Sequence, residues 1–189
     1  MSGPDPYFFG YGSLVNRATH DYRMPRPARL TGWARTWKHT ALRPVAFLTA
    51  VRDPSSTIDG LIAPVPGGDW MALDAREWAY ERLLTTDVVH DLPGSVEIAV
   101  YAVPNTHQAS PDIAHPILLS YLDVVVQGYL REFGREGVGR FFSTTHGWNA
   151  PILDDRPAPV YPRAQQLSAE ETALVDSYLM QMDAQIVRN

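Results

Sequence analysis

The chain has 189 residues, of which 45% are hydrophobic and 20% are charged, and its formal net charge at pH 7 is -5. This length suffices for one domain with a sizeable core, and the acidic balance, with no stripe of basic residues, argues against a nucleic-acid partner. Because cysteine is absent, disulfides, thiolate nucleophiles and cysteine-containing zinc sites are excluded.

The amino terminus, MSGPDPYFFG, has neither the basic segment nor the long apolar core of a signal peptide. No apolar run is as long as a membrane span. We therefore expect a cytoplasmic protein without a membrane partner, and we expect residues 1–189 to form a single domain. The sequence assigns no oligomeric state.

The first half of the chain is predicted to be rich in strands. Aromatic, β-branched and alternating apolar residues predict strands at 7–9, within 28–42, at 44–51, at 57–65 and at 95–103. The sequence Asp53-Pro54-Ser55-Ser56 is typical of a turn, so the strands on either side of it are expected to form a hairpin. A helix capped by Asp69 is predicted over 69–83.

The second half is predicted to contain two helices separated by a long irregular stretch. An apolar stripe predicts a helix over 116–133, with Gly134 at its exit. Residues 134–166 are rich in glycine and proline and include a Pro-rich loop at about 147–166. The motif SAEE is a capping box that opens a last helix over about 168–186. Together these elements predict an α+β domain with about five or six strands and three helices.

The stretch Gly10-Tyr11-Gly12-Ser13 follows directly after the first predicted strand. Glycines at such a point let a ligand approach the backbone closely, and successive N–H groups there can hold an anion or a carbonyl oxygen. The stretch lacks the third glycine of a dinucleotide fingerprint and the Gly-Lys-Ser/Thr of a P-loop. A tight turn without a ligand is the structural alternative.

Glu77 is the second candidate, because a helix from Asp69 places it on one face with Trp70, Leu73 and Tyr80. Burial in an apolar stripe raises the pKa of a carboxyl, as a general base near neutral pH requires. Glu81 is expected to raise that pKa further by charge repulsion. Alternatively, Asp74 and Glu77 form a capping box, or Glu77 pairs with Arg82 or with an arginine distant in sequence.

The remaining polar residues give weaker indications. The six histidines lack the spacing of metal ligands, so no metal site is expected. Ser143 and His146 are close in sequence, but no nucleophile-elbow motif accompanies them. Asp154 and Asp155 are more typical of a turn in a Pro-rich loop than of a catalytic pair.

Three stretches, taken in this order, resemble the γ-glutamylcyclotransferase-like superfamily. They are YFFGYGSL at 7–14, ARLTGWART at 28–36, and DGLIAPV followed by ALDAREWAYERL within 59–83. A looser match is LLSYLDVVVQGYLREFG at 118–134. The family's glutathione-recognition motif after the second strand is replaced here by ALRPVAF.

The resemblance implies a small, closed or nearly closed mixed β-barrel flanked by helices, with a pocket at one barrel mouth. It also implies an enzyme that converts a small γ-glutamyl amide to 5-oxoproline and a free amine, without a cofactor. By motif, Glu77 is the catalytic acid and base. The substrate cradle comprises Tyr11, Gly12, Ser13 and Leu14, with hydroxyls offered by Tyr11 and Ser13, and Tyr121 corresponds to a pocket tyrosine. The Pro-rich loop has no counterpart in the family and is interpreted as a cover over the pocket.

Two other hypotheses compete with the cyclotransferase. One is a protein of the same fold that binds a ligand or processes another amide without cyclotransferase activity. The other is a hydrolase that uses Ser13 or the pair Asp154 and Asp155. Glu77 favours the cyclotransferase, because a pure binding module does not require a carboxylate on an apolar face.

Overall fold

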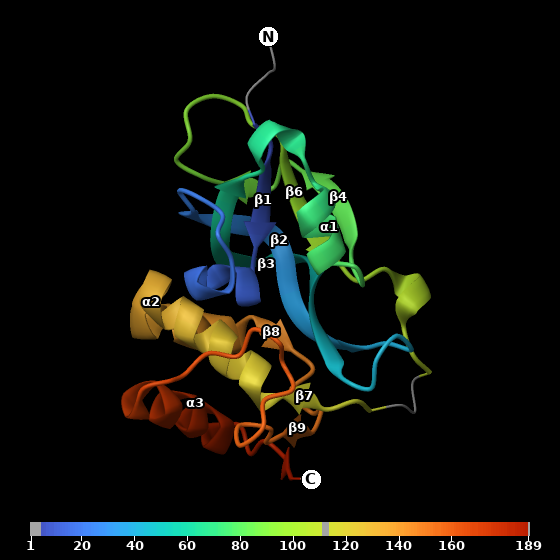
Figure 1. Ribbon diagram of the computed structural model, residues 1–189, viewed down its shortest axis with the longest axis vertical. Helices are drawn as coiled ribbons and strands as arrows, with labels where there is room; N and C mark the ends of the chain where they lie inside the picture. The colour runs from blue at the N-terminus through green and yellow to red at the C-terminus, as the bar shows by residue number, and fades with distance from the viewer. Residues whose placement is uncertain (1–4, 111–113, 189) are drawn as a thin grey trace.

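The computed structural model describes residues 5–110 and 114–188. Its main sheet has the strand order β4-β6-β1-β3-β2-β5, and β8 pairs with the free part of β2. These strands are β1 (Tyr7–Gly10), β2 (Arg26–His39), β3 (Ala46–Pro64), β4 (Glu81–Thr85), β5 (Val88–Val89), β6 (Ile98–Ala102) and β8 (Thr145–His146). The sheet is mixed and strongly curled into a half-barrel (Figure 1).

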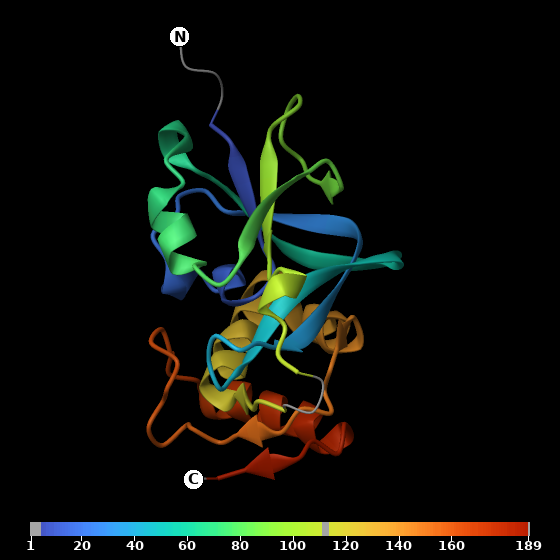
Figure 2. The same ribbon diagram turned by 90° about the vertical axis from the view of Figure 1, so that its right-hand side faces the viewer.

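Helices and a small second sheet cover one end of the half-barrel. The α-helices in the described part of the chain are α1 (Met71–Arg76), α2 (Leu119–Ser143) and α3 (Ala169–Gln181). The second sheet has the order β10-β9-β7, from β7 (Ile117–Leu118), β9 (Ile152–Leu153) and β10 (Ile186–Val187). In both views α2 lies between the curled sheet and α3, whereas α1 lies beside the sheet (Figures 1 and 2). The predicted α+β fold, with a closed or nearly closed mixed β-barrel flanked by helices, is confirmed, and the described strands form a strongly curled half-barrel.

The predicted hairpin at 53–56 is wrong, because β3 continues through it. Both halves of β3 pair antiparallel with β2, and the register passes from Thr31↔Thr57 to Trp33↔Arg52. The residues between form a bulge closed by the Asp53 carboxylate, which accepts hydrogen bonds from Ser55 and Ser56. The turn chemistry was read correctly, but it produces an excursion from one strand instead of a reversal.

The helix predicted over 69–83 is also too long. Asp69 does accept a hydrogen bond from the Met71 amide (3.1 Å), but α1 ends at Arg76 and Glu77 is its C-terminal cap. The next residues form β4, which pairs with β6 at the edge of the sheet. Pairing with a strand distant in sequence therefore overrides the helical pattern of 81–83.

The predicted helix over 116–133 extends further than expected. It begins at Leu119 and, after a kink at Gly134 (φ 67°), resumes to Ser143. Gly134 therefore bends the helix instead of ending it, and the residues after it were wrongly assigned to the irregular stretch. The capping box of the last helix is confirmed, but α3 ends at Gln181 because Ile186 and Val187 pair with β9.

The helix α2 is pressed against the short 3-10 helix η1 (Ser13–Val15), which follows β1. The Asn16 side-chain amide donates hydrogen bonds of 2.9 Å to the Val124 carbonyl and to the Gln127 side chain. A Cβ atom on Gly128 would lie 2.7 Å from the Asn16 backbone nitrogen. Glycine at this position therefore sets how closely α2 approaches the segment after β1.

Among the described residues, no helix is both long enough and apolar enough to cross a membrane.

Gly128→Ala should destabilise the fold by about 1–3 kcal/mol, because the added methyl group meets backbone atoms that cannot move aside. The free energy of unfolding from a urea titration measures this effect. Gly139→Ala, in the same helix, is the matched control. Its Cβ would lie 3.2 Å from the Tyr178 hydroxyl, at the free end of a side chain that can shift, so this variant should keep its stability or gain up to about 1 kcal/mol, because alanine favours a helix more than glycine does. Equal losses in both variants would contradict this account of the α2 contact.

Candidate active site

A pocket lies where β1 ends. Its inner chamber, of about 30 Å³, is lined by all six predicted site residues: Tyr11, Gly12, Ser13, Leu14, Glu77 and Tyr121. The inner chamber shares Ser13, Glu77 and Tyr121 with a wider outer chamber of about 440 Å³. Glu77 therefore stands at the junction between the two chambers.

The position of Glu77 follows from the end of α1. Its amide donates to the Leu73 carbonyl (2.9 Å), and its own carbonyl accepts from the Tyr80 amide (2.8 Å), so the backbone around it is fixed. The side chain is only 16% exposed. Burial raises the pKa of the Glu77 carboxyl, while the positive charges of Arg76 and Arg163 act in the opposite direction. The prediction that charge repulsion from Glu81 raises the pKa of Glu77 further is wrong, because Glu81 lies exposed in β4.

Arg76 connects Glu77 with the segment after β1. Its Nε lies 3.3 Å from Glu77 Oε1, and its Nη2 lies 3.2 Å from the Ser13 hydroxyl. The same guanidinium donates to the Thr19 carbonyl (2.8 Å). Glu77 thus does have an arginine partner, but it is the residue beside it in sequence; Arg82, which the sequence suggested, pairs with Asp74 (2.8 Å). The Asp74 carboxylate also accepts from the Tyr101 hydroxyl. No capping box forms between Asp74 and Glu77, because Asp74 lies inside α1 and Glu77 caps its C-terminus.

Both glycines of the YGSL segment stand where a side chain would collide. A Cβ on Gly10 would lie 2.5 Å from Leu14 Cβ, and one on Gly12 would lie 2.7 Å from the Tyr121 hydroxyl. Among residues 5–110 and 114–188, the Gly12 and Leu14 amides donate to no protein acceptor, and the Ser13 backbone faces the Tyr121 hydroxyl. The segment is therefore a backbone edge that lines the pocket, and its Gly12 and Leu14 amides have no protein acceptor in the described part of the chain.

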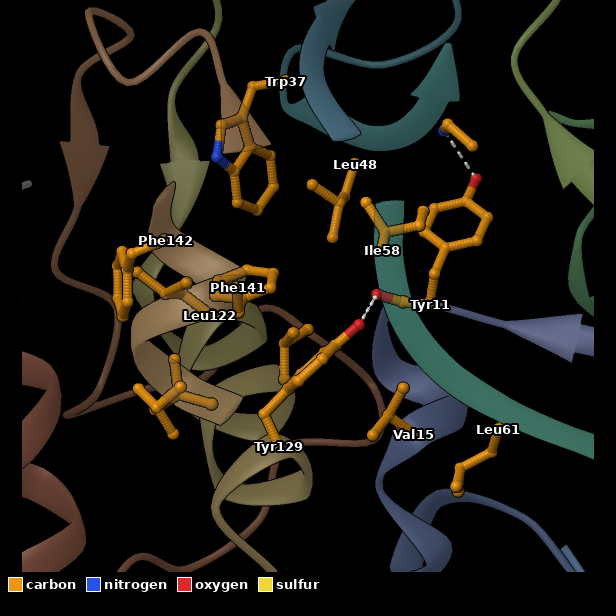
Figure 3. Close-up of a cluster of buried hydrophobic side chains, with 14 of the residues drawn as sticks. Tyr11, Val15, Trp37, Leu48, Ile58, Leu61, Leu122, Tyr129, Phe141 and Phe142 are labelled. Atoms are coloured by element: carbon orange, nitrogen blue, oxygen red, sulfur yellow. Dashed lines mark hydrogen bonds between the residues drawn. The ribbon is translucent and has the colours of Figure 1, made fainter. Parts of the chain in front are cut away.

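The side chains of this segment differ from what was expected in one respect. The Tyr11 hydroxyl is not available to a ligand, because it accepts from the Ala50 amide (3.0 Å; Figure 3) and donates to the Tyr101 carbonyl. Burial raises the pKa of Tyr11 far above its ordinary range. Leu14 packs with Phe8 and other apolar residues of a second small core. The Ser13 hydroxyl, by contrast, lies 3.2 Å from the Arg76 guanidinium, beside Glu77.

Several pocket residues lie outside the predicted set. Tyr80 lines both chambers and donates to the Leu48 carbonyl (2.8 Å); the sequence had placed it on the same helical face as Glu77. Tyr161 and Arg163 come from the Pro-rich loop, and Tyr161 packs edge-on against Tyr121 with ring centroids 5.0 Å apart. Burial raises the pKa of the Tyr80 and Tyr121 phenols well above 10.0.

The residues of the hydrolase hypothesis do not come together. The Asp155 carboxylate accepts from the Ser120 amide and hydroxyl and from the Val160 amide, so it fixes the loop. Asp154 pairs with Arg188 (3.2 Å). Within the described ranges, no group of three or more histidine, cysteine, aspartate or glutamate side chains is arranged to hold a metal ion.

No protein-family model and no curated protein matches the chain. Solved structures do match it. YkqA from Bacillus subtilis is 21% identical with a TM-score of 0.58, over 77% of this chain but only 57% of YkqA. The uncharacterized human protein loc79017 is 14% identical with a TM-score of 0.61, over 92% of this chain and 99% of that one. A protein named gamma-glutamyl cyclotransferase is 13% identical with a TM-score of 0.58, over the same shares. The chain therefore shares the fold of these proteins, including that of the gamma-glutamyl cyclotransferase.

Proposed function

We propose that this protein is a γ-glutamyl cyclotransferase. It would convert a small γ-glutamyl amide or peptide to 5-oxoproline and the free amine, with no cofactor. The observation that carries the proposal is the position of Glu77, a largely buried carboxyl beside the bare backbone edge of Gly12 to Leu14.

The reaction requires one group that moves a proton twice. The α-ammonium of the substrate must lose a proton before its nitrogen attacks the γ-carbonyl carbon. The new C–N bond closes a five-membered ring, and the C–N bond to the leaving amine breaks after that nitrogen gains a proton. Glu77 would accept the first proton and return it to the leaving nitrogen, so that the carboxylate is regenerated. The ring nitrogen loses a second proton as the lactam forms, and this proton ends on the released amine, which leaves as an ammonium ion. Its raised pKa supports this role, because it brings the carboxyl closer to neutral pH.

The second requirement is that the substrate is held in a folded conformation, and the backbone edge of Gly12 to Leu14 would meet it. Ring closure is intramolecular, so a large part of the rate comes from holding the substrate folded, with its amine against its own γ-carbonyl. Amides of Gly12 and Leu14 without protein acceptors can hold a carboxylate or the oxyanion of the tetrahedral intermediate. A Cβ at Gly12 would occupy the space that the Tyr121 hydroxyl takes.

A binding protein of the same fold is the second candidate, and the ion pair between Arg76 and Glu77 favours it. A carboxylate held by its neighbour at 3.3 Å can be a structural anchor without moving any proton.

The two candidates differ in their products. The purified protein is incubated with glutathione, γ-glutamyl amino acids and γ-glutamylamines, and 5-oxoproline and free amine are measured. Equimolar release of both supports the cyclotransferase, whereas binding without product from every compound supports the binding protein.

Glu77→Gln should lower kcat about a hundredfold to ten-thousandfold, as expected on removal of a general base. The thermal midpoint of unfolding should stay the same or rise slightly at pH 7, because a neutral amide avoids the cost of burying a carboxylate. Glu81→Gln, on the exposed side of β4, is the matched control and should keep full activity. Full turnover in Glu77→Gln would remove this residue from the mechanism.

The pH dependence of kcat/KM should report the protonation state of Glu77. Only deprotonated Glu77 can act as the base, so the rate should fall as the pH drops through its pKa. Because burial raises that pKa, the acid limb should lie above the value of about 4.3 usual for a glutamate. A limb at or below that value would show that another group controls the rate.

A further inference from the structure

The outer chamber carries positive charge in an otherwise acidic protein. Its lining includes Arg43, Arg76 and Arg163, and Glu77 is the one acid among the lining residues. The whole chain has a formal charge of -5. Arg76 is occupied by Glu77, Ser13 and Thr19. The charges of Arg43 and Arg163 are therefore those that a ligand in this chamber would meet.

Arg163 is held in place by the loop that carries it. The Val160 amide donates to Asp155 (2.9 Å), the Tyr161 amide to the Ser120 hydroxyl (3.3 Å), and the Ala164 amide to the Tyr161 carbonyl (3.1 Å). In Figure 2 this orange loop rises from the helical layer on the side of the molecule where α1 lies. The arginine is half-buried, and within residues 5–110 and 114–188 its guanidinium makes no ion pair or hydrogen bond.

Arg43 faces the same chamber from the segment between β2 and β3. Its guanidinium lies over the Trp78 ring, 5.3 Å from the centroid, and the edge of a stacked guanidinium remains able to donate hydrogen bonds. Trp78 follows Glu77 directly in sequence. The two arginines thus enter the chamber from the Pro-rich loop and from the β2–β3 segment, with Glu77 at the inner boundary.

We propose that Arg163, assisted by Arg43, binds a carboxylate on the leaving amine of the substrate. This inference rests on the proposed function. If the glutamyl part lies along the backbone edge beside Glu77, the amine released at Glu77 extends through the outer chamber, towards these arginines. A guanidinium without a protein partner matches a carboxylate in charge and in geometry. The preferred substrates would then be γ-glutamyl amino acids or peptides, and γ-glutamylamines without a carboxylate would be poor substrates.

The test compares γ-glutamyl-alanine with its carboxamide, which differs only in the charge of the leaving amine. Both are assayed for 5-oxoproline at a pH above the acid limb, so that Glu77 is deprotonated throughout. The wild-type kcat/KM should favour the acid by about tenfold to a hundredfold, as for a lost hydrogen bond to a charged group. Arg163→Gln should remove most of this preference by lowering kcat/KM for the acid alone, and Arg163→Lys should restore part of it.

Arg135→Gln, on the exposed surface of α2 and outside the chamber, is the matched control and should leave both substrates unchanged. Thermal unfolding shows whether each variant is folded. No preference in the wild type, or an equal loss for both substrates in Arg163→Gln, would overturn the inference while leaving the cyclotransferase proposal intact.

If neither compound is turned over, calorimetric titration with the same two compounds decides the question separately. Tighter binding of the acid than of the carboxamide, abolished in Arg163→Gln, would support the carboxylate site although the cyclotransferase proposal had failed. Equal affinity for the two compounds would overturn the proposal of a carboxylate site at Arg163.

Discussion

The position of the candidate site depends on a buried hydrogen-bond network centred on Arg35. This guanidinium is fully buried, where a charge is tolerated only if its donors are satisfied. It donates to the Thr145 hydroxyl (3.0 Å), the Thr144 hydroxyl (2.8 Å) and the Tyr129 hydroxyl (3.0 Å). The Tyr129 hydroxyl in turn lies 2.9 Å from the Tyr11 carbonyl, at the start of the glycine segment (Figure 3). Strand β2 and helix α2 therefore jointly fix the backbone that borders the pocket.

The site is consequently a junction of three elements that are distant in sequence. The helix α2 holds the segment Gly10 to Asn16 through the Tyr129 hydrogen bond and through the close approach at Gly128. Arg76, at the end of α1, donates a hydrogen bond to the Ser13 hydroxyl of the same segment. Because Arg76 also contacts Glu77, the acid and the backbone edge are positioned by one side chain. This rigidity suits a reaction whose rate depends on holding a substrate in a folded conformation.

The sequence predicted those parts of the site that depend on local chemistry. Glycines after a strand and a carboxyl among apolar residues are local patterns, and Gly12 and Glu77 both line one pocket. Glu77 reaches it from the end of α1 and not from a helical face, and the roles of both residues stay predictions. The end of α1 could not be predicted, because the residues after Glu77 pair with β6, which lies outside the window of a helical pattern. Arg163 was missed for a related reason. It belongs to an irregular loop without a motif, and its approach to the chamber depends on hydrogen bonds of that loop to Asp155, within it, and to Ser120 of α2.

The carboxylate proposal has an electrostatic consequence for Glu77. In the free protein, the charge of Arg163 lowers the pKa of Glu77 and so partly offsets the effect of burial. A carboxylate bound to Arg163 would neutralise that charge, and a ligand in the chamber would exclude water, so both changes would raise the pKa of Glu77. Glu77 would then become a stronger base when an acidic substrate is bound than when the pocket holds water. A neutral leaving amine would produce only the second change. Substrate selection and proton transfer would thus be coupled through Arg163, without any movement of the backbone.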